Sequence, residues 1–403
     1  MDTHIGLSRV VFYALLTSLT AFSIDALMPA LLVIGARVPS SQHFAPHHLI
    51  SLFIAGMVIG ELFVGPISDA IGRKRALLLG LMIYVAGTVI CLLAPSIEML
   101  VAGRIVQGIG VAGPKIATRA MIRDQFAGDA MARVMSFLFS LFILVPMIAP
   151  MFGQGLMILG GWPAIFYAYL VAAAGLSAWL LWKQPETLPL DRRIPFSGRR
   201  IFGNISRILS NRRVVLLIVA TGLVFGAQLT YLSLSAQVLA SVYEITTGLP
   251  YIFALLAGGI GLASFLNGRA VVRFGSTSLA RAGFWGLCLT GCALTLAGLV
   301  TGGAPHIVIF ISLSVGAFFS IGILFGNLNA MALEDLGQMA GIASSVVASI
   351  SSLVATLFAL GIAVMGTDTV MPLALGLLIA GAVALVLSEH AASAPRIPVI
   401  PLR

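Results

Sequence analysis

The chain has 403 residues, of which 59% are hydrophobic and only 9% are charged, and its mean hydropathy is +1.07. Soluble proteins carry roughly a quarter charged residues, so this composition excludes a soluble globular domain and predicts a polytopic membrane protein. A net charge of +9 could indicate a nucleic-acid partner, but the positions of the basic residues argue against one.

Apolar runs of about 20 residues, long enough to cross a bilayer as helices, recur along the whole chain. We predict twelve spans, at about 10–36, 49–70, 76–95, 97–119, 133–158, 162–182, 214–240, 249–268, 279–300, 305–330, 338–365 and 369–388. If the N-terminus is cytoplasmic, all of the 23 Lys and Arg residues except Arg37, Arg104 and Lys115 fall in cytoplasmic segments. This is the positive-inside pattern, and it predicts that both termini are cytoplasmic.

The first span contains the sequence AFSIDALMPAL, residues 21–31, with Asp25 as the only charged residue between Arg9 and Arg37. Such a carboxylate costs at least ~2–3 kcal/mol on insertion scales, so we expect it to have a function. Pro29 has no N–H to donate to the carbonyl of residue 25, which predicts a bend there. Asp25 is therefore our first candidate for binding a proton or substrate, with Met28 beside it. The alternative is a packing role, bonded to a neighbouring helix. Because the run is too long for a signal-peptide core, we interpret it as an uncleaved helix.

The loop after the second span reads GPISDAIGRK, residues 65–74. We expect Gly65-Pro66 to end or bend the second helix, and Gly72 to allow a tight turn before a basic run. Asp69 beside Arg73 can form a reversible latch between helices, although an ordinary positive-inside loop would look similar.

The fourth span, within GRIVQGIGVAGPKIATRAMIRD (103–124), places Arg104, Gln107, Gly108 and Lys115 on one side of a helix. A buried arginine needs a carboxylate or carbonyl partner. The fifth span contains VPMIAPMFGQG, where Pro146, Pro150 and Gly153 predict a bent, closely packed helix. Small-residue pairs at GxxxG spacing, Gly56/Gly60 and Gly222/Gly226, favour close helix contacts elsewhere.

A proline- and charge-rich segment at 183–213 separates two sets of six spans, which predicts bundles at 1–182 and 214–403. Its second half carries one apolar helical face, formed by Ile201, Phe202, Ile205, Ile208 and Leu209. Such a helix would lie on the inner membrane surface, or else form a solvated linker. Gly65 and Gly72 recur as Gly268 and Gly275, each 203 residues later, which indicates a repeat typical of transporters.

These motifs resemble those of the major facilitator superfamily. Its signature loop G-x-L-a-D-r-x-G-r-k matches at Gly65, Asp69, Gly72, Arg73 and Lys74, and its R-x-x-Q-G signature matches at Arg104, Gln107 and Gly108. The resemblance implies an all-α membrane fold of 12 transmembrane helices in two pseudo-symmetric six-helix bundles. It places Gly65, Asp69, Gly72, Arg73 and Arg123 at a cytoplasmic gate that stabilises an outward-open state. It also associates Arg104 with proton coupling.

The fifth span is similar to the antiporter motif of exporters in a looser form, which favours export over uptake. The stretches RAMIRD, PETLPLDRR and MAGIASSV resemble the bicyclomycin-resistance branch of twelve-helix drug:proton antiporters. Three positions depart from these relatives. Ala70 replaces the usual Arg of the loop, Glu61 stands where a neutral Gln is usual, and Lys115 stands where a small residue is usual.

Two interpretations of Glu61 and Lys115 stay open. They can neutralise each other as a buried pair, or one of them can face a cavity and bind a charged substrate group or carry a proton. A cation in the cavity would favour anionic or zwitterionic substrates. In the second half, Gln228 and Tyr231 are candidate substrate contacts, with packing roles as the alternative.

No motif of a hydrolase, metalloprotease or nucleotide-binding protein is present, and Cys91, Cys288 and Cys292 lack metal-ligand spacing, so we interpret them as packing residues. We therefore predict no catalytic residues, no metal and no cofactor, with an ion gradient as the energy source.

Our interpretation is proton-coupled efflux of small amphipathic molecules such as drugs, by a monomer in a bacterial inner membrane. Asp25, Glu61 and Arg104 would couple protons. The nearest alternative is a dedicated exporter of one anionic or zwitterionic metabolite, such as a siderophore or amino-acid derivative. An uptake symporter and a membrane enzyme or receptor are more distant alternatives.

Overall fold

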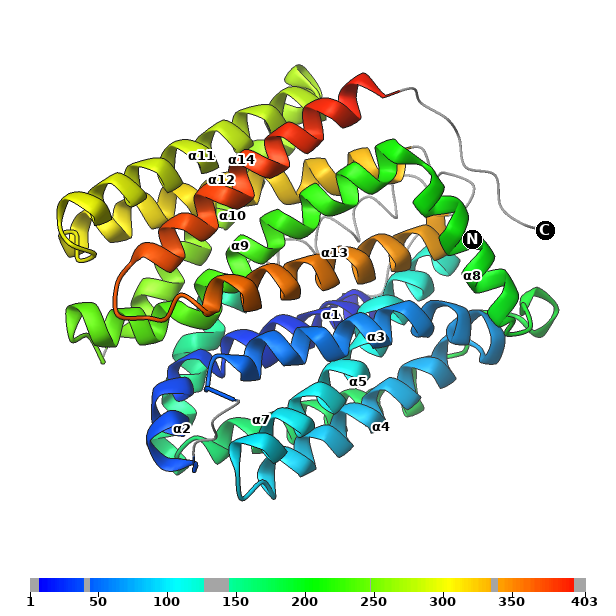
Figure 1. Cartoon of the computed structure of the whole chain (residues 1–403). Coiled ribbons are helices and arrows are strands. Elements are labelled where there is room, and N and C mark those ends of the chain that lie inside the picture. The colour runs from blue at the N-terminus through cyan, green and yellow to red at the C-terminus, as the bar shows by residue number, and fades with distance from the viewer. Residues whose placement is uncertain (1–6, 40–43, 127–144, 247, 335–339, 395–403) are drawn as a thin grey trace. The chain divides into compact units, whose positions relative to one another are not determined.

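The computed structural model describes residues 7–39, 44–126, 145–246, 248–334 and 340–394 (Figure 1). Every regular element in these ranges is helical, which confirms the all-α prediction. Ten of the described helices are long and apolar enough to cross a membrane. The chain is therefore a multi-pass membrane protein.

The chain divides into two compact units, which are described separately. Unit 1 is Met1–Gly198. Its helices are α1 (Leu7–Asp25), α2 (Leu31–Arg37), α3 (His48–Ile71), α4 (Arg73–Leu92), α5 (Ile97–Gln125), an unlabelled helix at Val145–Gly160 and α7 (Pro163–Lys183), with short 3-10 turns at Met28–Ala30 and Leu190–Arg192. The long helix α5 packs closely against both α3 and α4 and also contacts α1.

Unit 2 is Arg199–Arg403. Its helices are α8 (Gly198–Ser210), α9 (Arg212–Tyr243), α10 (Leu249–Phe274), α11 (Ser276–Val300), α12 (Ile307–Glu334), α13 (Ala340–Ala363) and α14 (Met371–Ser393). Helix α9 packs against α13, α14 and α12, so it has the central place in unit 2 that α5 has in unit 1.

The observed helices follow the predicted spans within a few residues at most boundaries. The predicted fourth span is α5, which is 29 residues long and is not among the ten. The predicted fifth span is represented by the helix at Val145–Gly160, and its first part, 133–144, lies outside the described residues.

The first span is interrupted at its acid. Helix α1 ends at Asp25, a 3-10 turn follows at Met28–Ala30, and helical structure resumes with α2 at Leu31. The predicted bend is therefore confirmed. By contrast, α3 continues through Pro66 to Ile71, so Gly65-Pro66 does not end this helix, and the alternative of a bend stays a prediction. A proline removes one backbone hydrogen bond, which helices of membrane proteins tolerate when neighbours pack around them.

Small residues bring the helices into close contact, as predicted. A Cβ atom at Gly56 or Gly60 of α3 would clash with the backbone carbonyl of Ile105 or Ile109 of α5. In unit 2, the pair Gly222 and Gly226 of α9 makes the same kind of approach to α13. These contacts replace the hydrophobic driving force that is absent between helices in lipid.

The two halves of the sequence repeat share one backbone turn. Gly72 separates α3 from α4 with φ +102° and ψ 155°, and Gly275 separates α10 from α11 with φ +75° and ψ 157°. Both conformations require positive φ, which glycine adopts without a steric penalty. The sequence repeat is therefore also a structural one.

The amphipathic segment forms helix α8, but its apolar face is divided. Ile208 is buried against the protein, whereas Phe202 is 65% exposed.

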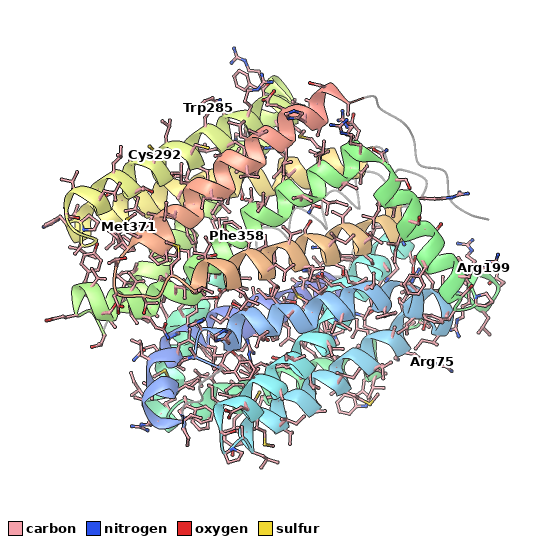
Figure 2. All side chains as sticks on the ribbon, in the orientation of Figure 1. Arg75, Arg199, Trp285, Cys292, Phe358 and Met371 are labelled. Carbon is pink, nitrogen blue, oxygen red and sulfur yellow. The ribbon has the colours of Figure 1, made fainter. Side chains whose placement is uncertain are left out.

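The three cysteines differ in exposure. Cys91 is buried and Cys288 is half-buried, whereas Cys292 is exposed on α11, the helix that also carries Trp285 (Figure 2). The packing interpretation is therefore wrong for Cys292.

Candidate functional site

Asp25 lies at the break in the first span and is almost completely buried. It is 5% exposed, and Met28, in the turn that follows, is buried as well. The part of the chain that the structure describes provides no hydrogen bond or ion pair to the Asp25 carboxyl group. A carboxylate in such a position is stabilised only when water or a cation reaches it, so its charge depends on access.

The helix at Val145–Gly160 packs directly against this break. A Cβ atom at Gly153 would clash with the carbonyl oxygen of Ala26, the residue after Asp25. The rings of Phe152 and Phe22 lie 5.7 Å apart. A Cβ atom added at Gly155, two residues further on, would have no neighbouring atom within 4 Å. The close approach thus depends on Gly153.

The prolines of this helix occupy different positions. Pro150 is buried and Pro146 is half-buried. Helical structure continues through both residues, to Gly160. The predicted bent helix is therefore helical where it is described, and its contact with the Asp25 break was not foreseen.

Arg104 is fully buried and binds backbone carbonyls instead of a carboxylate. Its Nη2 donates to the carbonyl of Ser23 on α1 and its Nε to the carbonyl of Leu49 on α3, each at 3.0 Å. Its Nη1 donates to the Gln107 side chain, and the guanidinium lies 4.1 Å from the ring centroid of Phe53. The Arg104 side chain thereby connects α5 with α1 and α3. Its contact on α1, the Ser23 carbonyl, lies two residues before Asp25.

The network around Arg104 continues through α4 and α7. Gln107 donates to the Thr88 hydroxyl at 2.8 Å, and the Ser23 and Tyr84 hydroxyls share a 2.6 Å hydrogen bond. The Tyr169 hydroxyl donates to the Ser23 carbonyl at 3.2 Å. Neither tyrosine was predicted as a site residue, because a hydroxyl within an apolar span does not indicate its partner.

Glu61 and Lys115 form an ion pair between α3 and α5. The Glu61 side chain is 0% exposed and the Lys115 side chain is 21% exposed. The lysine Nζ also lies 3.8 Å from the Met57 sulfur. Lys115 follows Arg104 by eleven residues on α5, about 16 Å along a helix axis. Unit 1 therefore contains two separate charged groups, one around Asp25 and Arg104 and one at Glu61 and Lys115.

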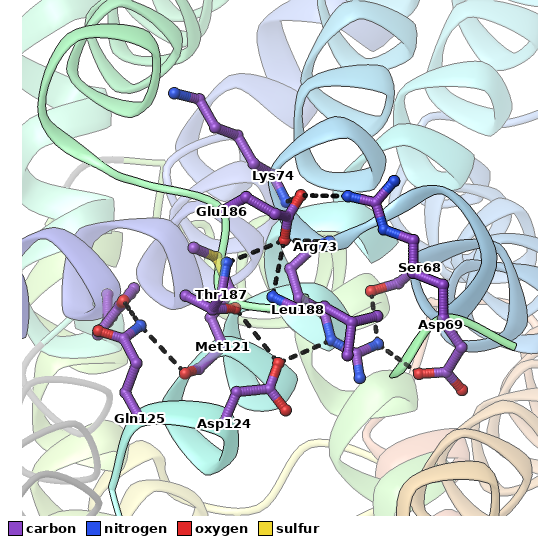
Figure 3. Close-up of polar contacts among 12 residues, drawn as sticks. Ser68, Asp69, Arg73, Lys74, Met121, Asp124, Gln125, Glu186, Thr187 and Leu188 are labelled. Atoms are coloured by element: carbon purple, nitrogen blue, oxygen red, sulfur yellow. Dashed lines mark hydrogen bonds and ion pairs between the residues drawn. The ribbon is translucent and has the colours of Figure 1, made fainter. Parts of the chain in front are cut away.

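The signature loop forms a set of contacts that we call the clasp: Ser68, Asp69, Arg73, Lys74, Asp124, Glu186 and Thr187. Arg73 is its centre (Figure 3). The guanidinium makes an ion pair with Asp69, donates to the Ser68 hydroxyl at 3.0 Å, and donates to Asp124 at the end of α5 at 3.0 Å.

Glu186 closes the clasp from the segment after α7. Its carboxylate accepts the backbone N–H groups of Arg73 at 2.9 Å and Lys74 at 3.2 Å, the first residues of α4 (Figure 3). A carboxylate in this position binds free donors at the positive end of the helix dipole. Thr187 donates its hydroxyl to Asp124 at 3.2 Å, and the Lys74 ammonium donates to the Gln184 carbonyl at 2.8 Å.

The structure brings together only part of the predicted gate. Asp69 and Arg73 meet, and Gly72 forms the turn between them and α4. Gly65 lies within α3, and Arg123 is exposed beside the clasp instead of within it. Asp124 and Glu186 were missed, although the sequence PETLPLDRR placed an acid directly after a span.

The two candidates in unit 2 have different environments. Tyr231 is almost fully buried, donates its hydroxyl to Ser314 at 2.9 Å, and packs edge-on against Phe318. This geometry favours the packing role for Tyr231. Gln228 is half-buried, and its Oε1 has no hydrogen-bond partner among the described residues. It retains a free acceptor for a substrate. Over the same described residues, no cluster of His, Cys, Asp or Glu has the geometry of a metal site.

Comparisons with known proteins agree with this architecture. Residues 13–364 match the model of the Major Facilitator Superfamily. The bicyclomycin resistance protein homolog of Haemophilus influenzae is 29% identical over 368 residues, covering 90% of this chain and 91% of the relative. The multidrug resistance protein MdtL of Salmonella heidelberg is 30% identical over 303 residues, covering 74% of each chain.

The fold also matches solved transporter structures. The crystal structure of a D-xylose-proton symporter superimposes with a TM-score of 0.71 at 15% identity, covering 98% of this chain and all of that one. Proteins of this kind are transporters without a cofactor, not enzymes. From its sequence match, its helices and its signature residues, this chain belongs to the major facilitator superfamily of membrane transporters.

Proposed function

We propose that this protein exports small amphipathic molecules such as drugs from a bacterial cell, in exchange for protons across the inner membrane. Residues 1–182 and 214–403 form two six-helix bundles that alternate access to the substrate, joined by the linker at 183–213. The protein acts as a monomer with both termini in the cytoplasm. The printed names of the relatives, a bicyclomycin resistance homolog and a multidrug resistance protein, support export of drug-like molecules.

The observation that carries the proposal is the burial of Asp25 at a helix break. Burial disfavours the charged form of a carboxyl group, whereas entry of water favours it. A conformational change that opens this position to one side of the membrane therefore changes whether the group holds a proton. The Arg104 network begins two residues away and links that position to α3, α4, α5 and α7.

The clasp is a set of contacts that can form in one conformation and break in another. Arg73 connects Asp69 at the end of α3 with Asp124 at the end of α5. In our proposal these contacts hold the cytoplasmic side of unit 1 in one state and are released in the other. Ion pairs and hydrogen bonds of this kind are exchanged during rigid-body transitions.

The test of the proposal is Asp25→Asn. We expect this variant to insert and fold normally but to lose proton-driven transport in everted membrane vesicles, because the amide cannot exchange a proton. Asp191→Asn, on an exposed position of the linker, is the matched control and keeps wild-type transport. Undiminished pH-driven efflux by Asp25→Asn would remove this residue from the mechanism.

A second candidate function is the export of one dedicated anionic or zwitterionic metabolite. The partly exposed ammonium of Lys115 favours it, because a cation attracts an anionic group of the substrate. Drug-susceptibility tests on a deletion strain, run beside an assay of metabolites secreted into the medium, separate the two candidates. Loss of secretion without any change in susceptibility identifies the metabolite exporter.

A further inference from the structure

The environment of Lys115 indicates the charge of the transported molecule. We infer that Lys115 and Arg119 of α5 bind the anionic group of the substrate, and that the preferred substrates are amphipathic molecules carrying a carboxylate. This inference rests on the proposed transport function and specifies its substrate class.

The two partners in the Glu61–Lys115 ion pair are unequally exposed. Glu61 is fully enclosed, whereas Lys115 is 21% exposed along its side chain. A molecule that approaches this pair therefore meets the ammonium group and not the carboxylate. An ammonium has three donors, so Lys115 can bind a second anion while it remains paired with Glu61.

Further cations lie on the same helix, α5, beyond Lys115. Arg119 and Arg123 follow Lys115 at steps of four residues, so they form one stripe with a rise of about 6 Å per step. Both arginines are exposed. Asp124, at the end of the stripe, is bound by Arg73 and Thr187 in the clasp.

The inner end of this stripe carries more positive than negative charge. Arg119 interacts electrostatically with the same Glu61 carboxylate that pairs with Lys115. Two cations thus share one enclosed acid, which leaves a net positive charge. A carboxylate is attracted to such a position and an organic cation is repelled.

The stripe also has a useful direction for an exporter. It runs from the clasp, where α5 ends, toward the interior of the helix, where Lys115 lies. An anionic molecule entering at the clasp end would pass Arg123 and Arg119 before it reaches Lys115. Electrostatic attraction of this kind raises the local concentration of a charged ligand.

The decisive variant is the double substitution Glu61→Gln/Lys115→Ala, which removes the ion pair as a whole and leaves Arg119 as the remaining cation. The probe is one fluorescent dye scaffold in three forms, with a carboxylate, a neutral methyl ester or an amine. Counterflow in proteoliposomes measures transport of each form without a pH gradient. Thermal shift of the purified protein measures binding of the same three compounds.

We expect the wild-type protein to prefer the carboxylate form over the amine form by about tenfold, which corresponds to about 1.4 kcal/mol. The double variant should lose part of that preference, because the ammonium that donates to the carboxylate is gone while Arg119 remains. In the double variant, transport of the neutral ester falls less than transport of the carboxylate form. Arg119→Gln reduces the preference for the carboxylate form in the same direction. Equal selectivity in the wild-type protein and the double variant would overturn the inference.

A purely structural ion pair predicts a different pattern. In that case Lys115→Ala and Glu61→Gln would each reduce transport of all three forms equally, and the double variant would restore all three. Failure of proton coupling does not affect this experiment, since counterflow and thermal shift require no gradient. A wild-type protein that binds none of the three forms more tightly than the others also overturns the inference.

Discussion

Three buried ionisable residues of unit 1, apart from Arg73 of the clasp, have different environments. Arg104 binds backbone carbonyls on two other helices, and Glu61 binds a lysine. Asp25 lies at a helix break with neither kind of partner among the described residues. Since an uncompensated ion is costly in an apolar interior, the third arrangement is the one suited to gaining and losing a proton.

Arg104→Lys tests whether the guanidinium geometry matters. A lysine ammonium cannot reach the Ser23 carbonyl, the Leu49 carbonyl and the Gln107 side chain together, and each hydrogen bond to a charged group contributes about 1.5–3 kcal/mol. We expect a lower melting temperature of the purified protein and a loss of proton-driven transport. Arg37→Lys, on an exposed arginine, is the control, and equal stability of the two variants would contradict the prediction.

At the scale of helices, small residues and helix ends determine how the site is built. Gly153 allows one helix to touch the break after Asp25, and Glu186 binds the first N–H groups of α4. Both contacts are made to backbone atoms, which every residue has. They therefore do not depend on the type of side chain at the contacted position. They connect the site to the packing of unit 1.

Gly153→Ala should disturb the break next to Asp25. The added methyl group clashes with the Ala26 carbonyl, and overpacking of this kind costs about 1–3 kcal/mol. We expect transport to fall while the protein still inserts. Gly155→Ala is a matched control because its added methyl group meets open space. Equal transport by the two variants would show that the close approach is unimportant.

Glu186→Gln should weaken the clasp. The amide keeps an acceptor oxygen but loses the negative charge at the start of α4, an effect of about 0.3–2 kcal/mol. We expect a lower melting temperature, and a change in transport rate because Arg73 is held less firmly. Asp191→Asn, five residues later and exposed, should change neither quantity. A Glu186 variant as stable as this control would contradict the assignment.

At the scale of the whole molecule, the two units share a plan. Each has a long central helix, α5 or α9, and each has a glycine turn between its second and third spans, at Gly72 or Gly275. Basic residues gather in alternate loops, which orients the chain in the membrane through the positive-inside effect.

The predicted orientation can be measured with single cysteines in a background in which Cys91, Cys288 and Cys292 are all replaced by Ser. A cysteine at Ala304, in the loop between α11 and α12, should react with a membrane-impermeant maleimide in intact spheroplasts. A cysteine at Asp191 should react only after the membrane is opened. Labelling of Asp191→Cys in sealed spheroplasts would reverse the proposed topology.

Much of the fold was predictable because span length and hydropathy are local properties of the sequence. The interruption after Asp25 followed from Pro29, and the Glu61–Lys115 contact was one of the two alternatives that their opposite charges at similar depth left open. The partners of Arg104 could not be predicted, since a backbone carbonyl has no sequence signal of its own. Tyr231 was placed among candidate contacts, although the packed helices bury it and engage its hydroxyl.

The sequence by itself determined that this is a helical transporter of the major facilitator type, where its helices run, and which charges lie inside them. These features depend on composition, periodicity and short motifs. Only the tertiary structure decided which charges meet. It separates Asp25 and Arg104 from Glu61 and Lys115, and it brings Glu186 to α4 from a segment 113 residues beyond Arg73. Such contacts join distant parts of the chain, so they depend on how helices pack and not on any local pattern of residues.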